Sequence, residues 1–171
     1  MKPLSKKSLV SKAARTQDFW SNPVFPEDTR WMRAAIMVAQ RGIGRSGVNP
    51  PVGCVLIGAD GQLLASCHTG AGGVPHAESA ALASLDDAGR IALQGGTAYV
   101  TLEPCAMCLG AMMHARIARI VYGANDQKSG VCGSSENLIN ANFFNHKIHL
   151  TNGILEDECK KLLKKFFNLR R

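Results

Sequence analysis

The sequence has no apolar run approaching the roughly 20 residues needed to span a bilayer, and no signal-peptide core follows its first lysines. Cysteine is also scarce. The chain of 171 residues has six cysteines, which are too few for a secreted disulfide scaffold. No internal repeat and no low-complexity tract is visible. These absences argue against a membrane protein and a disulfide-rich secreted scaffold, and they predict a cytoplasmic protein with no membrane partner.

Acidic residues are fewer than basic ones, at 13 against 20, which gives a formal net charge of +7. An excess of positive charge favours an anionic partner such as nucleic acid. The excess is concentrated partly at the two ends, and the first acidic residue is Asp18. We expect residues 1–26 to form a basic, irregular tail, with an organelle-targeting segment as the alternative interpretation, and residues 27–171 to form one domain.

Apolar periodicity predicts strands that alternate with helices. Helical spacing runs over 31–42, 77–88, 108–115 and 155–166, and strand patterns occupy 52–57, 63–67, 97–102, 117–122 and 148–151. Asp60-Gly61 is a hairpin turn signal between the first two strands, so that pair is antiparallel. The pattern therefore predicts an α/β layered fold with a mixed sheet.

Two short motifs carry metal-ligand residues at predicted helix starts, Pro75-His76-Ala77-Glu78 and Pro104-Cys105-Ala106-Met107-Cys108. A helix N-terminus lowers the pKa of a thiol, and cysteines three residues apart lie on one face of a helix. One imidazole and two thiolates give zinc three protein ligands, which leaves the open fourth position of a catalytic site. The sequence thus predicts one Zn²⁺ per subunit, held by His76, Cys105 and Cys108.

Glu78 lies two residues beyond His76 and is the predicted catalytic residue. A carboxylate beside a metal-activated water can take its proton, pass it to a ring nitrogen and protonate the leaving ammonia. A closed structural zinc site is the alternative, and it needs a fourth ligand, for which Cys132 and His114 are candidates. That alternative corresponds to a non-catalytic RNA-binding module.

These motifs resemble the cytidine deaminase superfamily, and the sequence from residue 97 onward resembles the tRNA-specific adenosine deaminases. The segments that carry the resemblance include Thr101–Cys108, His114–Ile117 and Phe166–Arg171. The resemblance implies a three-layer α/β/α sandwich with a five-stranded sheet, a homodimer, and conversion of adenosine to inosine in the tRNA anticodon loop. Pro104, Phe166 and Phe167 are then candidate substrate contacts, although packing of the last helix on the core also explains the phenylalanines.

The first half of the sequence, at residues 49–55 and 67–78, is more similar to the pyrimidine deaminase domain of riboflavin biosynthesis. His68 stands where the tRNA enzymes usually carry an asparagine, so Asn49 and His68 are candidate substrate contacts, or else caps of a turn and a strand. Riboflavin-pathway enzymes usually have a longer insert between the two cysteines, which favours a tRNA adenosine deaminase. A deaminase of a pyrimidine or another small nucleobase is the alternative.

Overall fold

A computed structural model of the chain, which describes residues 24–168, has one five-stranded mixed sheet. The strands are β1 (Gly53–Ile57), β2 (Leu63–His68), β3 (Thr97–Leu102), β4 (Arg119–Ala124) and β5 (His149–Thr151), in the order β2-β1-β3-β4-β5. β1 pairs antiparallel with β2 and β3, whereas β3, β4 and β5 are parallel. The predicted mixed sheet is confirmed, whereas most of the predicted tail at residues 1–26 lies outside the described residues.

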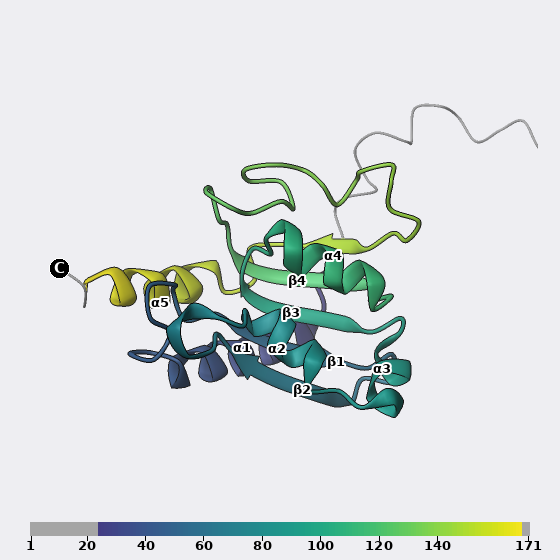
Figure 1. Cartoon of the computed structure of the whole chain (residues 1–171), viewed down its shortest axis with the longest axis horizontal. Coiled ribbons are helices and arrows are strands. Elements are labelled where there is room, and N and C mark those ends of the chain that lie inside the picture. Colours follow the sequence, from purple (N-terminus) through teal and green to yellow (C-terminus); the bar gives the residue numbers. More distant parts are fainter. Residues whose placement is uncertain (1–23, 169–171) are drawn as a thin grey trace, which may run out of the picture.

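Helices cover both faces of the sheet (Figure 1). One layer consists of α1 (Pro26–Arg41) and α5 (Glu156–Asn168). The other consists of α2 (Ala77–Ala83), α3 (Asp87–Leu93) and α4 (Ala106–His114), with a short 3₁₀ turn, η2 (Ala71–Gly73), before α2. The predicted α/β/α sandwich, with one helix layer on each face of the sheet, is confirmed.

In the part of the chain that the structure describes, no helix combines the length and the apolar character that crossing a membrane requires.

Side chains of the central strands alternate between two hydrophobic cores. Cys54 and Leu56 of β1 lie in the core under α2 and α4, whereas Val55 and Ile57 lie in the core under α1 and α5. All five residues of β1 are buried, which is typical of a strand covered on both faces.

The prediction of a single helix over residues 77–88 is wrong, because α2 ends at Ala83 and α3 begins at Asp87. The side chain of Asp86 caps α3 by accepting a hydrogen bond from the backbone N–H of Gly89 (2.8 Å). An aspartate side chain that binds a nearby backbone N–H favours the start of a new helix over continuation of the old one. The apolar spacing continues across this position, so it does not reveal the break. The first helix also begins earlier than predicted, with Pro26 in its first turn.

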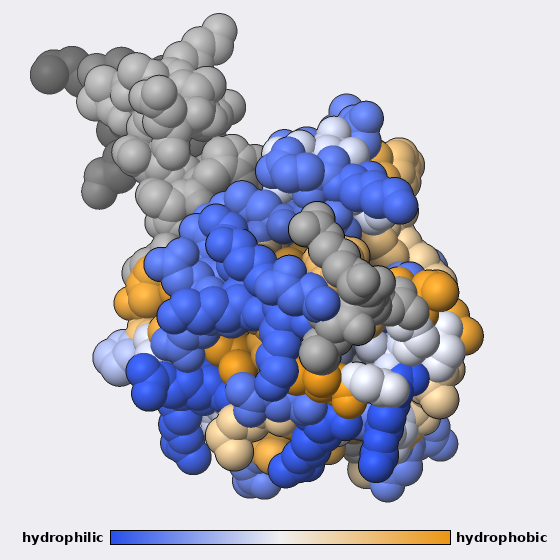
Figure 2. Space-filling model, turned by 90° about the vertical axis from the view of Figure 1, so that its left-hand side faces the viewer, coloured by the Kyte–Doolittle hydropathy of each residue, from blue (hydrophilic) through white to orange (hydrophobic). Residues whose placement is uncertain are grey.

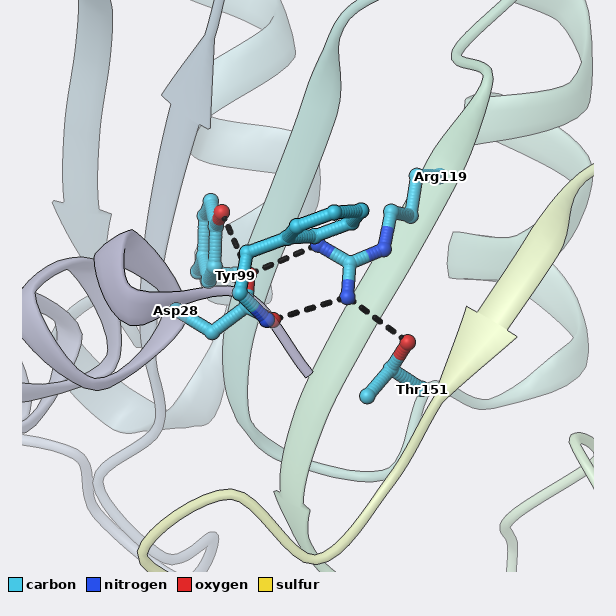
Figure 3. Close-up of polar contacts among 5 residues, drawn as sticks. Asp28, Tyr99, Arg119 and Thr151 are labelled. Carbon is cyan, nitrogen blue, oxygen red and sulfur yellow. Dashed lines mark hydrogen bonds and ion pairs between the residues drawn. The ribbon is translucent and has the colours of Figure 1, made fainter. Parts of the chain in front are cut away.

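A buried ion pair ties the start of α1 to the sheet (Figure 3). Both guanidinium Nη atoms of Arg119 bind the Asp28 carboxylate, at 2.6 and 2.8 Å, and Nη2 also donates to Thr151 Oγ1 at 2.8 Å. Tyr99 Oη and the backbone N–H of Phe25 complete the contacts to the same carboxylate. The network thus joins the start of α1 to β3, β4 and β5.

This network changes the pKa of Asp28. Burial by itself raises the pKa of the carboxyl, but hydrogen bonds from Arg119, Phe25 and Tyr99 outweigh it and lower the pKa below its usual 3.8. Burial and the bond to Asp28 raise the pKa of Tyr99, so its hydroxyl stays protonated and acts as the donor.

Replacing Arg119 with leucine should destabilise the fold by about 3 kcal/mol, because Asp28 remains buried after its counter-ion is removed. Urea-induced unfolding followed by far-ultraviolet circular dichroism measures the change. Lys160→Met is the matched control, since it removes an ion pair to Glu156 that is exposed, and it should leave the unfolding midpoint where it is. A loss below about 1 kcal/mol for Arg119→Leu would contradict a stabilising role for the buried pair.

The same network predicts how stability depends on pH. The folded pKa of Asp28 lies below the unfolded one, so its contribution is complete above the unfolded pKa and is lost as the pH falls through the folded pKa. Wild type should therefore be more stable than Asp28→Asn at pH 6, and the difference should shrink as the pH falls below about 4. Urea unfolding of both proteins at several pH values checks this, and a constant difference would contradict it.

Candidate active site

The metal-ligand residues lie at the starts of two helices that meet at one edge of the sheet. His76 is the N-cap residue of α2, which follows the loop after β2. Cys105 is the N-cap residue of α4, three residues beyond the end of β3, and Cys108 lies one turn further on the same helix. In the first turn of α4, the backbone N–H groups of Met107 and Cys108 bind the Cys105 sulfur and stabilise negative charge on it.

Three ligand atoms converge there. His76 Nδ1 is 3.6 Å from Cys105 Sγ and 3.5 Å from Cys108 Sγ, and the three atoms lie within 4.8 Å of one another. Tetrahedral zinc, with bonds of about 2.0 Å to nitrogen and about 2.3 Å to sulfur, holds such atoms about 3.6 Å apart. The side chains therefore fit a zinc ion. Across residues 24–168 no other group of this kind occurs, and neither Cys132 nor His114 joins this one.

The pKa values of the two ligand thiols shift in opposite directions. A hydrogen bond with Cys108 lowers the pKa of Cys105 to about 5 against the effect of burial, and backbone N–H groups and His76 lower it further. The same bond and burial raise the pKa of Cys108. Burial raises the pKa of Cys132 to about 12, the behaviour of an ordinary buried thiol.

Glu78 lies in the first turn of α2 and is buried, yet it lines the cavity that contains the ligands. Burial raises the pKa of its carboxyl, and the nearby Cys105 sulfur raises it further, while hydrogen bonds from its own backbone N–H and from Cys108 act in the opposite direction. A carboxyl group in this environment can both accept and release a proton near the metal-ligand atoms.

The cavity has a volume of about 380 Å³ and is lined by His76 and Cys105 of the ligand group. Its wall comes from four further parts of the chain: residues 48–50 and 52 with Thr69, residues 102–103 at the end of β3, the segment Asn125–Ser129, and the side chains of Leu163 and Phe167 on α5. A cavity of this size accepts a nucleobase-sized ligand.

Of the five predicted substrate contacts, Asn49 and Phe167 line this cavity and the other three do not. The side-chain amide of Asn49 donates to the Gly73 carbonyl at 3.0 Å, so it also anchors the loop before His76. Phe167 is 56% exposed, whereas Phe166 is 6% exposed and packs in the core.

His68 and Pro104 lie close to the cavity without lining it. His68 Nδ1 contacts the Thr69 carbonyl oxygen at 2.8 Å, and it is Thr69 that faces the cavity. Pro104 is buried, and its carbonyl accepts a hydrogen bond from Val131 at 3.1 Å. A substrate role for these residues stays a prediction.

Sequence reasoning missed the wall segment Asn125–Ser129. Its signal was available, because the segment directly follows β4, which is parallel to β3. Carboxyl ends of parallel strands meet at one edge of a sheet, where ligands bind. The segment therefore had to lie beside Cys105.

A family signature described as the cytidine and deoxycytidylate deaminase zinc-binding region matches residues 26–124, more than half of the chain. The chain belongs to this deaminase family. A tRNA-specific adenosine deaminase of Bacillus subtilis is 37% identical to it over 149 residues, which are 82% of this chain and 89% of the relative. One of Haemophilus influenzae is 36% identical, over 84% of this chain and 85% of the relative.

Solved structures with the same fold include two kinds of deaminase. A diaminohydroxyphosphoribosylaminopyrimidine deaminase and uracil reductase of Thermotoga maritima is 35% identical with a TM-score of 0.69, and the match covers 82% of this chain and 40% of that two-part enzyme. A structure from work on A-to-I editing by tRNA:A34 deaminases is 30% identical with a TM-score of 0.65, over 78% of this chain and 99% of that one. This deaminase thus resembles both of the families that its sequence suggests.

Replacing Cys105 or Cys108 with alanine should abolish retention of the metal, because each removes one of only three ligands. The metal content of purified protein, measured by mass spectrometry after gel filtration, should fall from about one ion per chain to near zero. Cys132→Ala is the matched control, a buried cysteine outside the ligand group, and should keep its metal. Loss of metal from Cys132→Ala would show that the site is closed by a fourth ligand.

Proposed function

We propose that residues 27–171 form a zinc-dependent deaminase that converts adenosine to inosine at the wobble position of a tRNA anticodon loop in the cytoplasm. The similarity to tRNA-specific adenosine deaminases, over four fifths of the chain, supports this substrate. All six cysteines are free, which fits a reducing compartment. The observation that carries the proposal is the position of α5 at the mouth of the cavity.

α5 joins the cavity to a basic surface. Leu163 and Phe167 line the cavity, and the lysines of the same helix are exposed: Lys160, Lys161, Lys164 and Lys165. In Figure 2, which views the molecule from the side where α5 ends, hydrophilic side chains dominate and hydrophobic ones lie between them. Single-stranded RNA loops are bound by such a combination, since bases stack on aromatic rings and lysines contact phosphates. A free nucleobase needs no such extension.

Zinc, when bound by His76, Cys105 and Cys108, supplies a Lewis acid that makes water acidic near neutral pH. Glu78 accepts a proton from the attacking water and gives it to the ring nitrogen of the base. It then takes the remaining proton from the oxygen that has been added to the ring carbon and gives it to the departing amino group, so that ammonia leaves and the base keeps a carbonyl oxygen. Burial of Glu78 keeps bulk water from competing for these protons.

A pyrimidine deaminase is the second candidate, because the likeness to the riboflavin-pathway enzyme extends over 82% of this chain at 35% identity. The experiment that separates the two incubates the purified protein with an anticodon stem-loop RNA, free adenosine, cytidine and the phosphoribosylated aminopyrimidine. Inosine in the RNA, detected by mass spectrometry of its nucleosides, supports the first proposal. Deamination of the pyrimidines alone would overturn it.

We also propose that two copies associate through the outer face of α4. Eight of the nine residues of this helix are apolar or glycine in the segment Ala106–His114, and Met107 is 56% exposed. A helix that is apolar on every side is normally covered on every side. Light scattering after gel filtration should give the mass of a homodimer.

Replacing Glu78 with glutamine should reduce inosine formation by at least about a hundredfold while the metal remains bound, because the amide cannot transfer protons and is not a ligand. Single-turnover assays on the stem-loop RNA and metal analysis of the same sample measure both properties. Glu27→Gln is the matched control, since Glu27 is exposed on α1. An active Glu78→Gln variant would contradict the proposed proton transfer.

A further inference from the structure

The wall segment Asn125–Ser129 is held in place by one carboxylate. Glu103, which follows β3, accepts a hydrogen bond at Oε2 from the backbone N–H of Asp126 (3.0 Å). At Oε1 it accepts two more, from Cys132 (2.9 Å) and Ser134 (3.1 Å). Glu103 is 3% exposed. Three backbone donors on a buried carboxylate are strong, charge-assisted hydrogen bonds.

The loop approaches this carboxylate closely because Gly130 has no side chain. A Cβ atom at position 130 would lie 2.4 Å from the Glu103 carboxylate, which is closer than any real contact. Val131 also donates a hydrogen bond to the Pro104 carbonyl at 3.1 Å. Residues 126–134 therefore wrap around the turn that leads into the metal ligand Cys105.

Both oxygens of Glu103 are engaged by the loop, since three of the roughly four acceptor positions of the carboxylate are occupied. Each already accepts a backbone hydrogen bond, whereas Glu78 lies beside the metal-ligand atoms. Glu103 also stands two residues before Cys105, so whatever it holds is fixed relative to the metal ligands. One of the residues that it holds, Asp126, lines the cavity, and Glu103 itself is part of the same wall.

We propose that Glu103 is a positioning residue that fixes the Asn125–Ser129 wall at a set distance from the metal and so determines how tightly the substrate base is bound. This role rests on the proposed function, in that the reacting base occupies this cavity. The carboxylate acts on substrate affinity through the wall, and the chemical step is left to Glu78.

Glu103→Gln tests the role with almost no change in shape. The amide keeps one oxygen and replaces the other with an NH₂ group, which cannot accept a hydrogen bond from the loop. Loss of one or two such bonds should raise KM for the stem-loop RNA about tenfold. We expect kcat to change much less than KM, and the metal content to stay at that of wild type.

Gly130→Ala approaches the same contact from the loop, since its Cβ would lie 2.4 Å from the carboxylate and 2.6 Å from the Asp126 carbonyl oxygen and would so force the loop and the carboxylate apart. Its backbone lies outside the left-handed region, so alanine strains the contact and leaves the dihedral angles allowed. It should give the same rise in KM, and the double variant should be no worse than either single one, because both break one interaction. Glu136→Gln, an exposed glutamate of the same loop, is the control and should behave as wild type.

Amide hydrogen exchange gives a second measurement, and in both test variants it should become faster across residues 125–134. A fall in kcat at constant KM, loss of metal, or unchanged exchange would overturn the positioning role. Failure of wild type to deaminate the RNA would instead count against the proposed function. In that case the KM comparison is made on the small substrate that wild type does deaminate, and it decides the role of Glu103 independently.

Discussion

Convergence of three ligand atoms requires two helices to begin at the same edge of the sheet, and strand direction provides this. β1 runs antiparallel to both of its neighbours, so β2 and β3 point the same way and their carboxyl ends lie at one edge. His76 follows the first of these ends and Cys105 follows the second. Because β4 is parallel to β3, its end brings Asn125 to the same place. The ligands and one wall of the cavity thus depend on the pairing of four strands.

The ligand set was predictable from sequence because each half of it is short and local. His76 and Glu78 are two residues apart, Cys105 and Cys108 are three apart, and the position of each motif at a helix start fixes how the side chains point. The central strands β1, β3 and β4 were predictable for a related reason, since burial on both faces produces continuous apolar runs. Helix boundaries were less so, because the cap at Asp86 interrupts a helix without interrupting the apolar spacing.

The cavity wall is formed by segments that only the fold brings together. The substrate is therefore harder to predict from the sequence than the reaction type, which depends on the two short motifs. Asn125–Ser129 and Phe167 lie outside the two metal-ligand motifs, and they meet the metal ligands only through the sheet and α5. Phe166 and Phe167 are adjacent in sequence, yet one packs in the core and the other reaches the cavity, because helical geometry turns neighbours about 100° apart. His68 shows the converse, since its neighbour Thr69 faces the cavity in its place.

Stability and chemistry are divided between the two faces of the sheet. The Asp28 ion pair joins α1 to the strands on one face, whereas the ligands start the helices on the other. Both arrangements place a buried carboxylate among several donors, but the partners differ: Asp28 is held chiefly by a guanidinium, and Glu103 by backbone N–H groups of one loop. A guanidinium fixes whole elements against each other, because it belongs to a strand. Backbone donors fix the loop that carries them, so a carboxylate of the second kind holds one wall segment in place beside the metal ligands.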